Sequence, residues 1–341
     1  MDDTSRYFHE SIFHYTTTDA SGTPVLKKNT FNRVLDFDLE MLSKDNKWHF
    51  SSFFAKSFDD FDHDETTAGG VYVEYSTKNL YVRLKPTYVG KHFNAEAGFV
   101  PSAGVYPGQI NYHWGVTYRF YPKLPSLVWM GPVTLFNQTY TPDGTLTDRN
   151  YLFTYSFNFR NTAVLDVAYN YIFQKLTNDF NPVGDYVRFL VGEEYDWHTT
   201  SATFKSNTRR IINYIVQATY GGFYNGTNFN VNAQLKARYQ PYGNISLLVD
   251  YNDVNLQDDH GQEKLFLIGP RIDVTFTEKL FLTTYYQYNN LLDNMNLNVR
   301  LQWRYQPASD LYIVYTENYF PSHFVSKNRA LVFKFTYWLN L

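Results

Sequence analysis

The sequence predicts an all-β fold: a transmembrane, antiparallel, up-and-down β-barrel of about 18 strands. Three observations lead to this prediction. Apolar and polar residues alternate with period two over most of the chain, the alternating segments are long, and aromatic residues gather on one of the two faces. Successive side chains of a strand point to opposite faces, so a period of two indicates strands.

The clearest strand covers residues 294 to 307. From position 295 to 305 its odd positions are apolar, and its even positions are polar or cationic. The same alternation occurs in residues 149–160, 163–174 and 227–240. Segments of this length exceed the average globular strand of roughly five or six residues. They match the roughly nine to eleven residues that a tilted strand needs to cross a bilayer.

Composition supports the same prediction. The 341 residues include 31 Tyr and 29 Phe, and no cysteine. A soluble sheet would need a second layer to cover so many aromatic side chains on one face, whereas outer-membrane barrels carry aromatic girdles on the face that meets lipid. No run of about eighteen apolar residues exists, which excludes transmembrane helices. The net charge of -3 argues against nucleic acid as a partner.

The connections between the expected strands alternate in length, which predicts an orientation. Short turns are expected at residues 43–47, 77–79, 160–162, 206–210, 240–244, 277–279 and 306–310, and longer connections at 59–70, 91–109, 141–147, 176–194, 257–263 and 318–328. Outer-membrane barrels place short turns on the periplasmic side. Residues 30–43 then descend toward the periplasm, and we expect an ascending strand before them, within Phe8 to Thr17.

The polar face of these strands carries the candidate functional residues. If the aromatic faces meet lipid, ten cations point into the lumen: Arg83, Lys85, Arg119, Arg160, Lys236, Arg238, Arg271, Arg300, Arg304 and Lys334. Candidate counter-charges are Asp36, Asp38, Glu40, Asp166, Asp250 and Asp273. Charged residues in a pore wall set its selectivity, so this face can orient anionic or polyhydroxylated solutes. The alternative is a network of ion pairs and amides that fills or hydrates the interior.

An acidic segment predicts a weak divalent-cation site, with no other cofactor. Its carboxylates are Asp59, Asp60, Asp62, Asp64 and Glu65. Hard cations prefer clustered carboxylate oxygens, but the spacing departs from the calcium-loop signature. The alternative is a solvated extracellular loop, and the same two interpretations apply, more weakly, to the acidic residues of 257–263.

A catalytic rim is a further alternative, because residues 192–198 (GEEYDWH) combine acids with a histidine. No nucleophile stands in a recognisable frame such as GxSxG. We therefore predict no catalytic residues, and a hydrolase at the rim stays an alternative.

Three segments carry a family resemblance: residues 29–58, 94–104 and 297–317. They resemble an uncharacterised outer-membrane β-barrel domain, a domain of unknown function that usually follows a family-9-like carbohydrate-binding module in Gram-negative envelope proteins. The resemblance implies that residues 1–341 are a single barrel domain, the C-terminal part of a longer protein or a shorter relative. It implies no catalytic residues.

Two functions stay open. The first is an outer-membrane channel or transport component with a polar, Arg/Lys-rich lumen, in a Gram-negative bacterium. The second is a barrel that anchors a surface glycan-binding or hydrolytic module. The expected partners are outer-membrane lipid, polar or anionic small solutes or glycans, and other envelope proteins.

Overall fold

The computed structural model describes residues 14–18, 24–28, 31–60, 64–95, 108–184 and 187–339. These residues form nineteen strands and a single 3-10 turn at Asp258–His260. Strands β3 to β19 run up and down as one antiparallel sheet, and their hydrogen-bonding order closes on itself as a barrel. The predicted all-β barrel is confirmed.

The strands are β1 (His14–Thr18), β2 (Pro24–Lys28), β3 (Asn32–Leu42), β4 (Trp48–Asp59), β5 (Thr67–Ser76), β6 (Leu80–Val89), β7 (Gln109–Tyr118), β8 (Leu127–Tyr140), β9 (Leu146–Phe159), β10 (Val164–Lys175), β11 (Glu194–Lys205), β12 (Ile212–Phe223), β13 (Gly226–Tyr239), β14 (Gly243–Asn255), β15 (Gln262–Thr277), β16 (Leu280–Asn289), β17 (Asn294–Gln306), β18 (Ser309–Phe320) and β19 (Val325–Phe335).

The predicted first strand of the barrel is wrong. Residues 8–13 lie outside the described part of the chain, and residues 14–17 belong to β1, which pairs with β2 in a separate two-stranded sheet. The described barrel therefore has 17 strands, close to the predicted number of about 18. The two strands of the separate sheet have five residues each, and a tilted strand of that length is too short to cross a bilayer.

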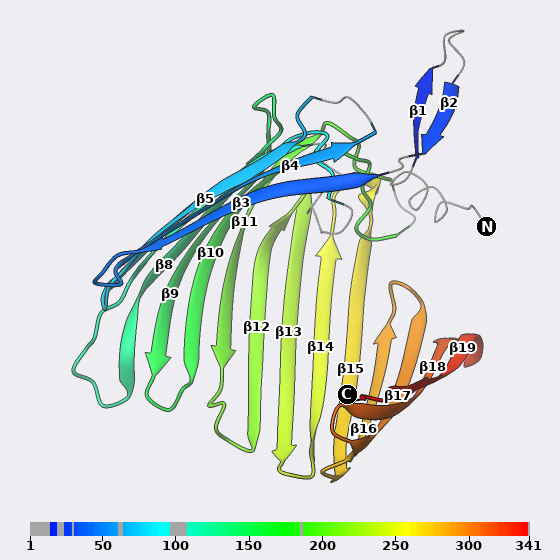
Figure 1. Cartoon of the computed structure of the whole chain (residues 1–341). Helices are drawn as coiled ribbons and strands as arrows, with labels where there is room; N and C mark the ends of the chain where they lie inside the picture. Colours follow the sequence, from blue (N-terminus) through cyan, green and yellow to red (C-terminus); the bar gives the residue numbers. More distant parts are fainter. Residues whose placement is uncertain are drawn as a thin grey trace. The chain divides into compact units, whose positions relative to one another are not determined.

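The chain divides into two compact units. The first unit comprises Met1–Gly115 and Phe136–Arg149, and the second comprises Val116–Leu135 and Asn150–Leu341. The first unit contains the ladder β3-β4-β5-β6, and the second contains the continuous ladder from β10 to β19. Within the second unit, β12 to β15 lie side by side as long strands (Figure 1).

In each unit, the strands of the barrel have a polar and an apolar face, as the alternation predicted. On β17, Arg300 stands opposite Thr283 of β16 and Val314 of β18, so these residues share one face. Leu301 stands opposite Leu282 and Ile313 on the other face. We call the side that carries Arg300 in the second unit and Arg83 in the first the polar face, and the opposite side the apolar face.

Aromatic pairs occupy both ends of the strands on the apolar face. We call the end near the 43–47 turn the turn end, and the opposite end the loop end. The ring centroids are 4.7 Å apart in Trp48–Tyr75 and 5.5 Å apart in Tyr305–Phe335 near the turn end, and 6.0 Å apart in Tyr112–Tyr140 and 6.1 Å apart in Tyr151–Tyr171 toward the loop end. Aromatic pairs near both ends of the strands agree with the girdles of a membrane barrel.

The difference in length between the two sets of connections is smaller than predicted. Long connections occupy 90–108 and 176–193, but β18 and β19 extend further than expected and leave only residues 321–324 between them. The Tyr224–Asn225 connection is a two-residue hairpin, because Phe223 pairs with Gly226. Among the described residues, no helix is long and apolar enough to span a membrane.

Candidate functional site

Five of the predicted lumen cations share the polar face of the second unit. Lys236 lies on β13, Arg271 on β15, Arg300 and Arg304 on β17, and Lys334 on β19. The strand register shows that they share this face. Lys236 and Arg271 both stand opposite Ser246 of β14, and Lys334 stands opposite Tyr312, which in turn stands opposite Gln302 of β17. Arg300 lies at the middle of β17, and the other four lie in the half of their strands nearer the turn end.

Only two of these five cations form ion pairs with carboxylates in the described structure. The guanidinium of Arg271 contacts Asp273 with an Nη2–Oδ1 distance of 2.9 Å, and Nε of Arg304 lies 3.5 Å from Oδ1 of Asp310. Within the described residues, Lys236, Arg300 and Lys334 form no ion pair. Of the six predicted counter-charges, Asp273 forms an ion pair with an arginine of this face, Arg271. The partner of Arg304, Asp310, was not among the predicted counter-charges.

The half of the polar face nearer the loop end carries amides instead of cations. Asn230 and Asn232 of β13 each donate to Asp250 of β14, at 2.9 and 3.0 Å, and Asn252 donates to the same carboxylate at 2.9 Å. A second group joins Asn296 to Asn318 at 2.9 Å. Asp250 is therefore satisfied by amides and does not act as the predicted counter-charge to a cation.

Three predicted lumen cations lie at the turn end. Arg119 follows the last residue of β7 and lies over the Trp129 ring at 5.6 Å, and Arg160 follows β9. Nη2 of Arg238 donates to the carbonyl oxygen of Arg210 at 3.0 Å. Arg238 therefore stabilises the connection at residues 206–211 through this hydrogen bond.

The last two predicted lumen cations, Arg83 and Lys85, lie on β6 in the first unit and line a pocket of about 470 Å³. The pocket also includes His113 of β7, whose Nε2 accepts a hydrogen bond from Nη2 of Arg83 at 2.9 Å. The other lining residues are Ser51, Ser52, Phe53, Gly70, Val71, Tyr72 and Thr87. This pocket combines three basic side chains with hydroxyl groups on the polar face.

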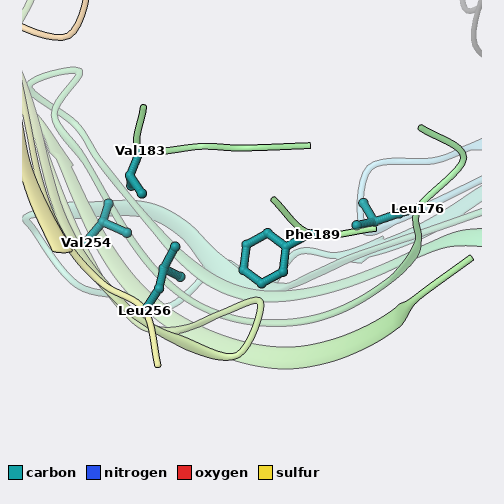
Figure 2. Close-up of a cluster of buried hydrophobic side chains, with 5 residues drawn as sticks. All are labelled: Leu176, Val183, Phe189, Val254 and Leu256. Carbon is teal, nitrogen blue, oxygen red and sulfur yellow. The ribbon is translucent and has the colours of Figure 1, made fainter. Parts of the chain in front are cut away.

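The connection between β10 and β11 folds back onto the polar face of the second unit. Phe189 of this connection is fully buried and packs with Leu176, Val183, Val254 and Leu256. Figure 2 shows these five side chains on the concave side of the curving strands. Because Val254 shares its face with Asp250 and Asn252, the concave side is the polar face. Residues 176–193 therefore cover part of that face near the loop end.

Aromatic stacking and hydrogen bonds hold this connection. The Phe189 ring stacks on His260 at 4.2 Å and on Tyr224 at 4.9 Å. Oε2 of Glu193 accepts hydrogen bonds from the Tyr195 hydroxyl at 2.7 Å and from the backbone N–H of Leu190 at 2.8 Å. These two bonds, with the tyrosine first, hold the pKa of Glu193 below its usual range.

The predicted cation site stays a prediction. Asp62 lies outside the described residues, and the side chains of Asp59, Asp60, Asp64 and Glu65 belong to no group of three or more described metal-ligating residues that could hold an ion. Among the described residues of this segment, the carbonyl oxygen of Asp64 lies 2.8 Å from Nδ1 of His92.

The acids and histidine of residues 192–198 do not converge. Glu194 forms an ion pair with Lys175 at 2.9 Å, and Glu193 holds Leu190 and Tyr195. His198 lies on the apolar face, where Nδ1 is 2.7 Å from the Tyr169 hydroxyl. His198 therefore belongs to the aromatic contacts of the apolar face, and Glu193 helps to hold the connection between β10 and β11. Within the described residues, no carboxylate forms an ion pair with His198.

Two features escaped the sequence analysis. One is the folded-back connection, whose apolar run at residues 187–191 (VRFLV) was a usable signal, because such a run in a polar loop favours docking. The other is Glu317, a buried carboxylate on the apolar face of β18 that accepts hydrogen bonds from the hydroxyls of Tyr315 and Tyr319. Both tyrosines lie two positions from Glu317 in the sequence, so period-two alternation places all three side chains on one face of the strand.

Comparison with known proteins yields fold matches at low similarity. No family model matches the chain, and no curated protein does. The siderophore receptor PirA from Pseudomonas aeruginosa aligns with a TM-score of 0.46 and 10% identity, covering 89% of this chain and 68% of the receptor. A mutant of the ferric enterobactin receptor PfeA from the same organism gives 0.44 and 7%, covering 84% and 65%. PirA from Acinetobacter baumannii gives 0.41 and 10%, covering 94% and 68%.

Proposed function

We propose that this protein is a transport component of the outer membrane of a Gram-negative bacterium, with a polar, Arg/Lys-rich lumen that admits polar or anionic solutes. The observation that carries the proposal is the set of cations on the polar face that lack an ion pair within the described residues, namely Lys236, Arg300 and Lys334. A network built only to fill the interior would pair its charges, because an uncompensated charge away from water is costly.

The two faces support a membrane location. An arginine placed on the lipid face at mid-bilayer costs about 2 to 4 kcal/mol, so the row that contains Arg300 must face water. The opposite face carries Leu301 with Leu282 and Ile313, between aromatic pairs near the two ends of the strands. This division of residues is the one that a bilayer requires of a barrel.

Ion conduction in planar bilayers tests the transport proposal. Purified protein reconstituted across a KCl gradient is expected to give discrete conductance steps and a reversal potential of the sign set by chloride, because cations in the wall attract anions. Arg300→Gln should move the reversal potential toward zero, whereas Lys44→Gln, in the exposed 43–47 turn, should leave it unchanged. A cation-selective channel would contradict the proposed role of the basic wall.

The alternative function is a barrel that anchors a surface glycan-binding or hydrolytic module, as the family resemblance implies. The observation that favours it is the seating of residues 176–193 on the polar face, which leaves less of that face open near the loop end. A barrel that stays silent in bilayers, even after the loop is released by Phe189→Ala, would support the anchor. Pull-down of envelope proteins or of surface glycans by the full chain would then identify what it holds.

A further inference from the structure

The strongest unassigned feature is the pocket of the first unit around Arg83, Lys85 and His113. It lies on the polar face of β4, β5, β6 and β7, at mid-strand height. Its volume of about 470 Å³ falls within the usual range for small-molecule sites, roughly 300 to 1,000 Å³. The pocket therefore has room for a small organic ligand.

Within the described residues, neither Arg83 nor Lys85 forms an ion pair, although Asp38, Glu40 and Glu74 lie on the same face of neighbouring strands. Glu74 is the register partner of Arg83, yet its carboxylate accepts hydrogen bonds from the hydroxyls of Tyr72 and Tyr81 and forms no ion pair with Arg83. An arginine always donates, so the 2.9 Å contact makes Nε2 of His113 an acceptor, and the imidazole contributes no charge to the pocket in this arrangement.

Arg83 also has an unused donor. Its Nε is buried and makes no hydrogen bond to any described residue. A guanidinium N–H without an acceptor is unfavourable, and an oxyanion is the acceptor that fits the planar fork of arginine. The contact with His113 occupies Nη2 and fixes the orientation of the guanidinium before a ligand arrives. Because Nε itself is buried, a ligand in the pocket would bind the other N–H groups of Arg83.

A glycine keeps the pocket open. A Cβ on Gly70 would lie 2.7 Å from Cε1 of Phe53 and 2.9 Å from Cγ2 of Thr87, both of which line the pocket. Any larger residue at this position of β5 would push these side chains into the space. The hydroxyls of Ser51, Tyr72 and Thr87 remain at the wall as neutral hydrogen-bonding groups.

We propose that this pocket binds the oxyanion group of a small solute, a carboxylate or a phosphate, through Arg83 and Lys85. Binding at a defined site goes beyond the passage of solutes along a charged wall, because it is saturable and selective. It also does not require the proposed transport function: a barrel that conducts no ions can still bind the ligand. Measuring binding and conductance separately keeps the two proposals distinguishable.

Calorimetric titration of the full chain in detergent micelles tests the site, with inorganic phosphate and succinate as separate ligands at constant ionic strength. We expect saturable binding of one or both, which identifies the preferred oxyanion. The Arg83→Gln, Lys85→Gln double variant should bind about tenfold more weakly or worse, because charge-assisted hydrogen bonds are lost. Lys44→Gln removes one positive charge in an exposed turn of the same unit and should keep the wild-type affinity.

A second measurement uses the wild-type protein and does not depend on the folding of a variant. Acylation of lysine amines is followed by mass spectrometry with and without the ligand. Lys85, whose side chain is exposed, should be protected by the ligand, while Lys44 should react at an unchanged rate. The proposal is overturned if neither anion binds saturably, if the double variant binds as well as the wild type, or if Lys85 and Lys44 are protected equally.

Discussion

At the scale of single residues, Asp45 shows how one carboxylate organises a turn. Ser43 Oγ donates to Oδ1 of Asp45 at 2.7 Å, and Nζ of Lys47 lies 2.9 Å from Oδ2. Between them Asn46 takes a φ of 55°, in the left-handed region that asparagine tolerates better than most residues. These contacts, with the bond from Ser43 first and that from Lys47 second, lower the pKa of Asp45 to about 2.

This pKa gives a testable pH dependence. The folded state favours the carboxylate, so the turn contacts are fully present above the unfolded pKa of about 3.9 and are lost as the pH falls toward about 2. Asp45 and Lys47 are half exposed, so the effect on global stability is small and the titration itself is the measurement. Carboxyl NMR in micelles should show a low midpoint for Asp45 that rises in Ser43→Ala. An ordinary midpoint in the wild type would contradict the geometry.

The alternation in the sequence groups residues that share one side of a strand, but it does not identify their partners on other strands. Period two alone puts Arg271 and Asp273 on the same side of one strand, and the structure shows them paired. The pairing of Arg304 with Asp310 depends on how the strands register across the 307–308 turn. The register of a hairpin follows from turn geometry, which the alternation of residues does not contain.

At the scale of elements, the connection between β10 and β11 shows best what the sequence does not reveal. The sequence marks it as long and polar at its start, yet two apolar partners of Phe189, Val254 at the end of β14 and Leu256 just after it, lie more than sixty positions later. No local pattern connects Phe189 with Val254 or Leu256. The sequence could therefore predict a connection here and its length, but not the surface on which it rests.

Phe189→Ala should release this connection. Replacing a buried Phe by Ala costs about 3 to 5 kcal/mol, and because the contacts hold a loop, the loss should appear as loop opening and not as unfolding of the strands. Each 1.4 kcal/mol is about a tenfold change in population, so protease cleavage within 176–193 should accelerate by roughly a hundredfold or more. Leu190→Ala, at a neighbouring exposed residue, is the control and should leave cleavage unchanged. Equal cleavage of both variants would show that Phe189 does not anchor the loop.

At the scale of the whole molecule, the fold was the most predictable property, because it follows from features repeated in every strand. Length and alternation identified β9, β10, β13 and β17 within a few residues of their observed bounds. The error fell on the segment before β3, where alternation over a few residues cannot distinguish a strand of the barrel from one of a small separate hairpin. Length decides that case, since β1 has only five residues.

We propose that the polar face of the barrel strands β3 to β19 meets water and that their apolar face meets lipid. Strand β17 offers the sharpest test of this proposal. Arg300 and Leu301 are adjacent in sequence and lie on opposite faces, each with one partner on either side: Thr283 and Val314 for Arg300, and Leu282 and Ile313 for Leu301. Arg304 is a poorer choice for charge reversal, because a glutamate there would stand beside Asp310, which now pairs with the arginine at 3.5 Å.

Arg300→Glu is expected to fold and insert as the wild type does, since one hydrated charge replaces another on a face where Arg300 has no ion pair among the described residues. Leu301→Arg should destabilise the barrel by about 2 to 4 kcal/mol, the cost of an arginine on the lipid face at mid-bilayer. Urea titration of both variants in lipid vesicles, followed by the heat-dependent gel mobility of folded barrels, measures the difference. Arg300→Gln controls for loss of the side chain without reversal of charge. Equal destabilisation by Arg300→Glu and Leu301→Arg would mean that the two faces do not meet water and lipid, and the membrane assignment would then be wrong.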